Sequence, residues 1–266
     1  MGIHLFLSPH LDDAVLSCGG VIHRLAQSGE RVVIVTVMAG EPQEPLLDTP
    51  ALQMLRPRWN KGEATIPVRR AEDAQAARQL QAQVYHMGLT ESAFRTTLCG
   101  AGDWIALYPD DASSFQGINQ ADDARVLLFG SNLPFPLSDI TTIYAPLGVD
   151  QHVDHQLVRD WALILTGSLT SPELKFYEEY PSARSKMALQ QAQTFYRRQL
   201  PALNIESEIA ALSSENLDAR LRAMRCYRSH LNSLWNDPAE MERLTRDYVL
   251  LVGEGTPAER YWRVVR

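Results

Sequence analysis

The sequence predicts an α/β fold in which helices cover both faces of a mostly parallel sheet. Short apolar runs alternate along the chain with longer stretches whose apolar residues recur at helical spacing. Strand, helix and strand in succession form right-handed βαβ units, and such units build a parallel sheet. The chain has 266 residues, 45% of them hydrophobic, which is enough for one large core.

Hydrophobic periodicity separates short strands from longer helices. Two connections lack periodicity: residues 41–67, which are punctuated by prolines, and residues 99–115, which contain Gly100, Gly102 and Pro109. The predicted elements, in chain order, are strand 3–7, helix 15–27, strand 31–38, loop 41–67, helix 68–82, strand 83–87, loop 99–115, strand 140–145, helix 156–165, strand 174–177 and helices 188–199 and 217–235, with a short strand and a turn within 247–263.

The chain shows no internal repeat and no linker rich in Gly, Ser or Pro that would separate two domains. We therefore predict a single domain over residues 1–266. Residues 1–180 are expected to form a Rossmann-like core, because the strand and helix signals alternate there. Residues 181–266 are expected to form a helical cap with a short strand, packed on that core.

Two polar clusters follow apolar strands at the point where each strand ends. His10, Asp12 and Asp13 come after strand 3–7, and the cluster from Asp150 to His155 comes after strand 140–145. The carboxyl ends of parallel strands line a crevice in which ligands bind. Side chains from the two clusters could together hold one divalent ion. The alternative for Asp12 or Asp13 taken alone is a helix N-cap, which is the commoner role for such a residue.

These two clusters resemble the motifs of the PIG-L and LmbE-like zinc-dependent N-acetylglucosaminyl deacetylases. The segment from His10 to Ala14 reads His-Leu-Asp-Asp-Ala where the family has His-Pro-Asp-Asp-Glu, so a proline and a glutamate of the motif are absent after the histidine. The segment from His152 to His155 reads His-Val-Asp-His where the family has His-Pro-Asp-His. Weaker resemblances lie at residues 18–20, 70–72, 86–89, 227–230 and 258–262, and the fourth of these reads Tyr-Arg-Ser-His where the family has Tyr-x-Ser-Gln.

The resemblance implies a role for each polar residue of the clusters. His10, Asp13 and His155 are expected to bind Zn²⁺ and to leave one coordination position open, as catalytic zinc requires. Asp12 is expected to act as the general base. His152 is expected to stabilise the oxyanion or to protonate the departing amine.

Three further residues are expected to support this site. Arg70 matches the arginine of the family's Arg-x-Glu block and is expected to contact the substrate, although a plain helix surface explains it equally well. Asp154 or Asp150 is expected to orient an imidazole through a hydrogen bond. Two imidazoles and a carboxylate also suit Fe²⁺, so the donor set leaves the identity of the metal open.

The resemblance therefore implies a metal-dependent hydrolase that removes the acetyl group from an N-acetylglucosaminyl or related N-acylated amino sugar, by attack of a zinc-bound water. One alternative is an amidase that cleaves a larger acyl group or a thiol conjugate with the same site. A second is a non-catalytic protein that binds a sugar or a nucleotide. The loops 41–67 and 99–115 are expected to form the walls or lid of the pocket, with Trp59, Trp104 and Tyr108 either lying against a sugar ring or anchoring the loops.

Composition excludes several other classes of protein. A net charge of −7 and a pI near 5.5 disfavour binding to nucleic acid. The sequence has no stretch of about 20 apolar residues and no secretory leader, so we expect neither a membrane span nor a membrane partner. Three scattered cysteines, Cys18, Cys99 and Cys226, fit a reducing cytoplasm rather than a disulfide framework. The sequence leaves homo-oligomerisation open.

Overall fold

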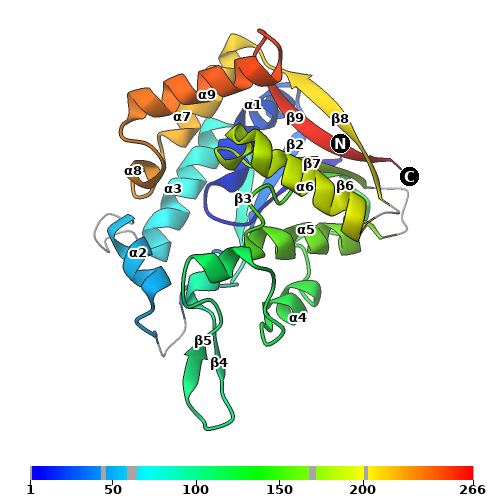
Figure 1. The fold of residues 1–266 in the computed structure, drawn as a ribbon. Helices are drawn as coiled ribbons and strands as arrows, with labels where there is room; N and C mark the ends of the chain where they lie inside the picture. The colour runs from blue at the N-terminus through cyan, green and yellow to red at the C-terminus, as the bar shows by residue number, and fades with distance from the viewer. Residues whose placement is uncertain (1, 43–45, 59–64, 168–171, 201–202, 266) are drawn as a thin grey trace.

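The computed structural model describes residues 2–42, 46–58, 65–167, 172–200 and 203–265. Its centre is a seven-stranded sheet in the order β3-β2-β1-β6-β7-β9-β8, with helices on both sides (Figure 1). The first five strands in this order are parallel, β9 pairs antiparallel with β7, and β8 pairs antiparallel with β9. The predicted fold class, a mostly parallel sheet flanked by helices, is confirmed.

The parallel strands are buried on both faces, which explains why they are nearly continuous apolar runs. On one face, Leu5 and Leu7 pack with Trp161 of α5, while Phe6 faces the opposite side and packs with Val15 of α1. Successive side chains of a strand point to opposite faces, so a single strand supplies both cores. The parallel strands are β1 (Ile3–Ser8), β2 (Arg31–Thr36), β3 (Gln83–His86), β6 (Ile140–Pro146) and β7 (Glu173–Tyr177).

The helices divide between the two faces. Helices α5 and α6 contribute to the same core as Leu5, whereas α1, α3 and α7 contribute to the core around Phe6. None of the helices in the described ranges is long and apolar enough to cross a membrane. The helices are α1 (Asp13–Gln27), α2 (Pro50–Arg58), α3 (Ile66–Gln79), α4 (Ala124–Phe129), α5 (Val153–Thr166), α6 (Lys186–Gln199), α7 (Ser214–Met224), α8 (Leu231–Leu234) and α9 (Pro238–Val252), with short 3₁₀ turns η2 (Ser92–Phe94), η3 (Ala112–Phe115), η4 (Leu137–Asp139) and η5 (Ser182–Arg184).

The C-terminal third differs from the prediction in its strands. Two eight-residue strands, β8 (Asn204–Ala211) and β9 (Ala258–Val265), extend the main sheet instead of one short strand. Strand β8 was missed because it is a largely exposed edge strand, so it lacks the buried apolar run of the central strands. The division of the domain at residue 180 stays a prediction.

The helices of the C-terminal third also differ from the prediction. The helix predicted over 217–235 ends at Met224, and a turn separates it from α8. Helix α9 was missed, and residues 247–252 belong to it rather than to a strand and a turn. The start of α9 has a local cause, since the Asp237 side chain accepts a hydrogen bond from the backbone N–H of Glu240 and Pro238 occupies the first turn.

The two predicted loops contain regular structure. In the first, Thr49 Oγ1 accepts a hydrogen bond from Leu52 N at 3.2 Å, and Pro50 opens α2. In the second, β5 (Trp104–Ala106) pairs with β4 (Thr96–Leu98), which precedes the predicted loop, and the two form a hairpin that projects from the body (Figure 1). Trp59 lies outside the described residues.

Candidate metal centre and active-site pocket

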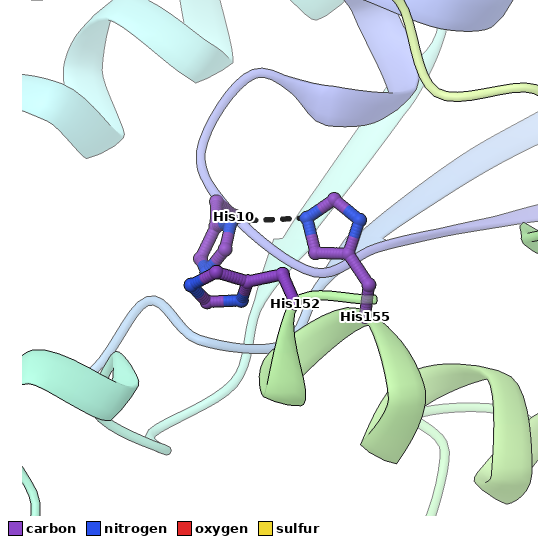
Figure 2. A group of neighbouring side chains, drawn as sticks. All are labelled: His10, His152 and His155. Carbon is purple, nitrogen blue, oxygen red and sulfur yellow. Dashed lines mark hydrogen bonds between the residues drawn. The ribbon is translucent and has the colours of Figure 1, made fainter. Parts of the chain in front are cut away.

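Three histidines meet where β1 and β6 end, as predicted from the strand-end rule (Figure 2). His10 follows β1, His152 is the N-cap of α5, and His155 lies in the first turn of that helix. One ring nitrogen from each lies within 4.8 Å of the others. Segments separated by more than 140 residues thus converge on one point, which is the arrangement that a metal ion needs.

Asp13 completes a compact triangle with two of these histidines. Asp13 Oδ2 lies 3.3 Å from His10 Nδ1 and 3.3 Å from His155 Nε2, and the two ring nitrogens are 3.4 Å apart. Ligand atoms at about 2.0–2.1 Å from a tetrahedral zinc ion lie about 3.3–3.4 Å from one another. The three atoms therefore fit three corners of such a tetrahedron and leave the fourth corner open.

The far nitrogen of each of these two rings is bound by a buried carboxylate. His10 Nε2 donates to Asp154 Oδ2 at 2.9 Å, and His155 Nδ1 donates to Glu179 Oε1 at 3.2 Å. These bonds leave the lone pairs of His10 Nδ1 and His155 Nε2 facing Asp13. Asp13 Oδ2 also accepts a hydrogen bond from His10 N at 2.7 Å. When both rings are neutral, three electron-rich atoms converge and favour a bound cation, and carboxylates that orient metal-binding imidazoles are a common feature of such sites.

The two orienting carboxylates are themselves fixed. Asp154 accepts hydrogen bonds from the Arg95 guanidinium and from Ser92 N, and Glu179 accepts from the backbone amides of Gly148 and Val149. Glu179 was not predicted, although it follows the apolar strand 173–177 and the same strand-end rule could have indicated it. Asp154 contacts His10, whereas Asp150 accepts from His152 N and Ser182 Oγ and acts on His155 only through its charge.

Replacing Glu179 tests whether its hydrogen bond with His155 strengthens metal binding. Glu179→Gln is expected to weaken metal binding about 10- to 100-fold, because the amide holds the His155 ring less firmly and makes it a poorer ligand. Competition with a chromogenic chelator measures the change. Glu178→Gln is a suitable control, because Glu178 binds Tyr248, Arg260 and Trp262 rather than a histidine of the cluster. An unchanged metal affinity in Glu179→Gln would contradict the expectation.

The charges of Asp13 and His155, which face each other, depend on one another. Burial alone would raise the pKa of Asp13, but the facing His155 and hydrogen bonds from both imidazoles lower this pKa well below its usual value. Burial alone would lower the pKa of His155, but Asp13 and Glu179 raise it well above its usual value. Without a metal, a proton on His155 thus takes the place of the cation between the two groups.

His152 is placed differently from the other two histidines. Its Nδ1 accepts a hydrogen bond from Asp154 N at 3.2 Å, which in the neutral ring leaves the proton on Nε2. A nitrogen that carries a proton donates a hydrogen bond and does not bind a metal. Burial and the neighbouring His10 and His155 lower the pKa of His152 well below its usual value, so the ring is neutral. The geometry therefore favours His152 as a hydrogen-bond donor over His152 as a fourth ligand.

Asp12 is buried beside the triangle and does not belong to it. Its side chain does not cap α1, and its Oδ2 lies 3.6 Å from His230 Nε2. Burial and the adjacent Asp13 raise the pKa of Asp12 well above its usual value. His230, which sequence reasoning treated only as part of a weak motif, thus enters the site from the C-terminal third of the chain.

These residues open into a cavity of about 280 Å³. Arg69 lines the cavity and forms an ion pair with Glu91 at 2.5 Å, whereas Arg70 lies outside it, with its Nε donating to Ala39 O at 2.7 Å. Arg70 is thus not among the residues that line this cavity, and its contact with substrate stays a prediction. Consecutive side chains on a helix point about 100° apart, so only one of the two arginines can face the pocket.

The two predicted wall segments do line the cavity, through other residues than expected. Helix α2 contributes Met54, and the segment 99–115 contributes Phe115, whose ring packs edge to face with His152 at 5.2 Å. Trp104 is exposed on the hairpin, and Tyr108 is buried with its hydroxyl donating to Asp122, so neither lines the pocket. Phe115 is the aromatic residue of the segment 99–115 that lines the cavity, and the burial of Tyr108 agrees with the alternative that it anchors the loop.

Solved structures share this fold over nearly their whole length. A deacetylase–bog complex from the biosynthesis pathway of teicoplanin is 25% identical, with a TM-score of 0.77 over 99% of this chain and 98% of that one. The zinc-inhibited form of teicoplanin deacetylase Orf2 is 22% identical, with a TM-score of 0.74 over 99% and 98%. GalB, the 4-carboxy-2-hydroxymuconate hydratase from Pseudomonas putida KT2440, is 18% identical, with a TM-score of 0.58 over 100% and 97%.

The similar deacetylases and the family model support the class of protein, an α/β deacetylase, and the histidine cluster is its candidate metal site. The family follows from the sequence itself, since a model of the family described as PIG-L: GlcNAc-PI de-N-acetylase matches residues 5–165, more than half of the chain. The protein belongs to the PIG-L family, as the two motifs indicated. No protein of curated function matches the sequence significantly.

Proposed function

We propose that this protein is a metal-dependent N-deacetylase of an N-acetylated amino sugar, with His10, Asp13 and His155 as the metal ligands. The triangle of ligand atoms, 3.3 to 3.4 Å on each side, is the observation that carries the proposal. Its donor set matches a catalytic zinc site with an open position. Fe²⁺ suits the same donors, and zinc is the first choice because of the family.

A divalent ion bound there supplies Lewis acidity, which lowers the pKa of a coordinated water to about 7 and polarises the amide carbonyl. Asp12 lies beside the ligands and accepts the proton of the attacking water. His152 Nε2–H donates to the carbonyl oxygen as negative charge develops on it. The oxygen of the attacking water first bonds to the carbonyl carbon. The C–N bond of the resulting tetrahedral species then breaks, and the proton held by Asp12 passes to the departing nitrogen, giving acetate and the free amine.

The polar wall of the cavity suits the hydroxyl groups of a sugar ring. Arg69 carries N–H donors and Glu91 carries carboxylate oxygens, and both side chains are held in place by their mutual ion pair. Burial alone would raise the pKa of Glu91, but Arg69 holds it below its usual value, so Glu91 accepts hydrogen bonds. A donor next to an acceptor matches vicinal hydroxyls, each of which both donates and accepts. The family description and the deacetylase relatives support an amino sugar as the substrate.

A second candidate is an amidase that acts on a larger acyl group, and the mouth of the cavity favours it. Three apolar side chains from separate segments line the cavity and are 37 to 42% exposed: Met54 of α2, Phe115 of η3 and Leu234 of α8. Such an apolar rim, which leaves large apolar side chains in water, suits an apolar part of a substrate. An acetyl group is too small to cover it.

One panel of substrates tests both candidates. Amine release is measured for N-acetylglucosamine, N-octanoylglucosamine and the octyl glycoside of N-acetylglucosamine, with protein loaded with Zn²⁺ or Fe²⁺ under anaerobic conditions. We expect metal-dependent release from the acetylated sugars. A preference of more than about tenfold in kcat/KM for the octanoyl amide would favour the second candidate, since about 1.4 kcal/mol of apolar burial supplies that ratio. If amine is released from none of the three compounds, the remaining candidate is a non-catalytic binding protein.

A further inference from the structure

The C-terminal third of the chain brings one side chain directly to the proton acceptor of the proposed reaction. The turn between α7 and α8 carries His230, whose Nε2 lies 3.6 Å from Asp12 Oδ2. Asp12 makes no side-chain bond to the helix that it precedes. Within the ranges that the structure describes, His230 is the side chain that pairs with this carboxylate.

A carboxylate of α3 binds the same turn at the residue that precedes His230. Glu72 Oε1 accepts from Ser229 N at 3.0 Å, and Glu72 Oε2 accepts from Ser229 Oγ at 2.5 Å. The adjacent Asp73 accepts from Tyr227 OH at 2.6 Å and binds Thr36 and His86 through its other oxygen. The backbone on the N-terminal side of His230 is thus fixed to α3 at two points.

Helix α3 therefore contributes to the pocket in two ways. Arg69 enters the cavity from its first turn, and Glu72 holds the turn that carries His230. This chain also has histidine where the resembling motif has glutamine, and both side chains place an N–H donor at a similar distance from the backbone. An N–H donor at this position can orient the Asp12 carboxylate.

We propose that Glu72, through Ser229, holds the His230 ring against the Asp12 carboxylate, and that Glu72 and His230 are positioning residues for this base. The inference rests on the proposed function, because it assumes that Asp12 accepts a proton from water. A general base acts when it lies about 2.6–3.2 Å from the atom that carries the proton, and a misplacement of about 1 Å costs about 100-fold in rate. Asp13, Arg69, His10 and Glu91 also act on the charge of Asp12, but His230 is the side chain whose ring nitrogen lies 3.6 Å from its carboxylate oxygen, so the position of that ring affects the orientation of the carboxylate.

The test compares variants at both ends of this connection. Glu72→Ala and His230→Leu are expected to lower kcat about tenfold or more with little change in KM or metal content. Glu72→Gln and His230→Gln are expected to recover most of the lost kcat, because each keeps an oxygen acceptor or an N–H donor at the same place. Ser229→Ala is a smaller change that should lower kcat in the same direction.

Ser213→Ala provides the matched control. Ser213 N and Oγ both contact Asn216 Oδ1, at 3.2 and 2.9 Å, which repeats the Glu72–Ser229 pattern at the other end of α7. This variant should lower Tm because it removes a helix N-cap, and it should leave kcat unchanged. If the role of Glu72 is purely structural, its variants should show a lowered Tm and an unchanged kcat, as Ser213→Ala does.

A crystal structure of Glu72→Ala provides a readout that does not depend on activity. We expect the His230 ring to have moved away from Asp12, and a ring that stays within 4 Å would overturn the inference. Displacement of His230 with unchanged kcat would also overturn it. If the wild-type protein releases amine from no N-acylated sugar, the proposed function fails, and a displaced His230 then shows only that Glu72 fixes the turn and overturns its role in catalysis.

Discussion

Asp12→Asn is expected to lower kcat for amide hydrolysis by about 10²–10⁴-fold, the range that general base catalysis contributes. Asparagine has nearly the same shape as aspartate but cannot accept a proton from the attacking water. The ligand triangle of His10, Asp13 and His155 does not include Asp12, so the metal should remain bound. Amine release from N-acetylglucosamine and the metal content of the purified variant are measured together.

The same variant separates an enzyme from a binding protein. A protein that only holds a sugar needs no proton acceptor beside its metal, so sugar affinity should be unchanged in Asp12→Asn. Asp150→Asn is the control, since Asp150 lines the same cavity and contacts His152 N and Ser182 rather than the ligand triangle. Full activity in Asp12→Asn would remove this residue from the mechanism.

His155→Ala is expected to abolish metal binding and to lower activity by at least about 10³-fold, because a metal ion contributes several kcal/mol to the stabilisation of the transition state. The loss removes one corner of the triangle and also leaves Glu179 without the imidazole that it orients. Elemental analysis should show less than one tenth of the wild-type metal content. Treating the wild-type protein with a chelator should reproduce the loss, and added Zn²⁺ or Fe²⁺ should reverse it only in the wild type.

His4→Gln serves as the control for this variant. His4 is a partly buried histidine of β1, and its Nε2 lies 3.9 Å from Glu30 at the end of the sheet away from the cluster. Its replacement should leave both metal content and activity unchanged. Retention of metal by His155→Ala would show that a different set of residues, such as one that includes His152, holds the ion.

Much of the central fold could be predicted because its signals are local. Strands such as β1 and β2 are buried on both faces and therefore appear as continuous apolar runs, and α1 and α5 show helical spacing next to them. The elements that were missed lack such signals. Strand β8 is half exposed at the edge of the sheet, and the hairpin β4–β5 has only three residues in each strand.

The sequence by itself determined the two motifs that supply His10, Asp13 and His155, because residues at the ends of parallel strands must meet at one edge of the sheet. Only the tertiary structure decided which side chains complete the site. Arg69 rather than Arg70 faces the cavity because the direction of a side chain depends on how its helix is rotated against the sheet. His230 arrives from a segment whose approach is fixed by packing between distant elements, and no local pattern in the sequence encodes that packing. Glu179 follows an apolar strand, so its place at the strand ends could be predicted, but its bond to His155 depends on the same packing.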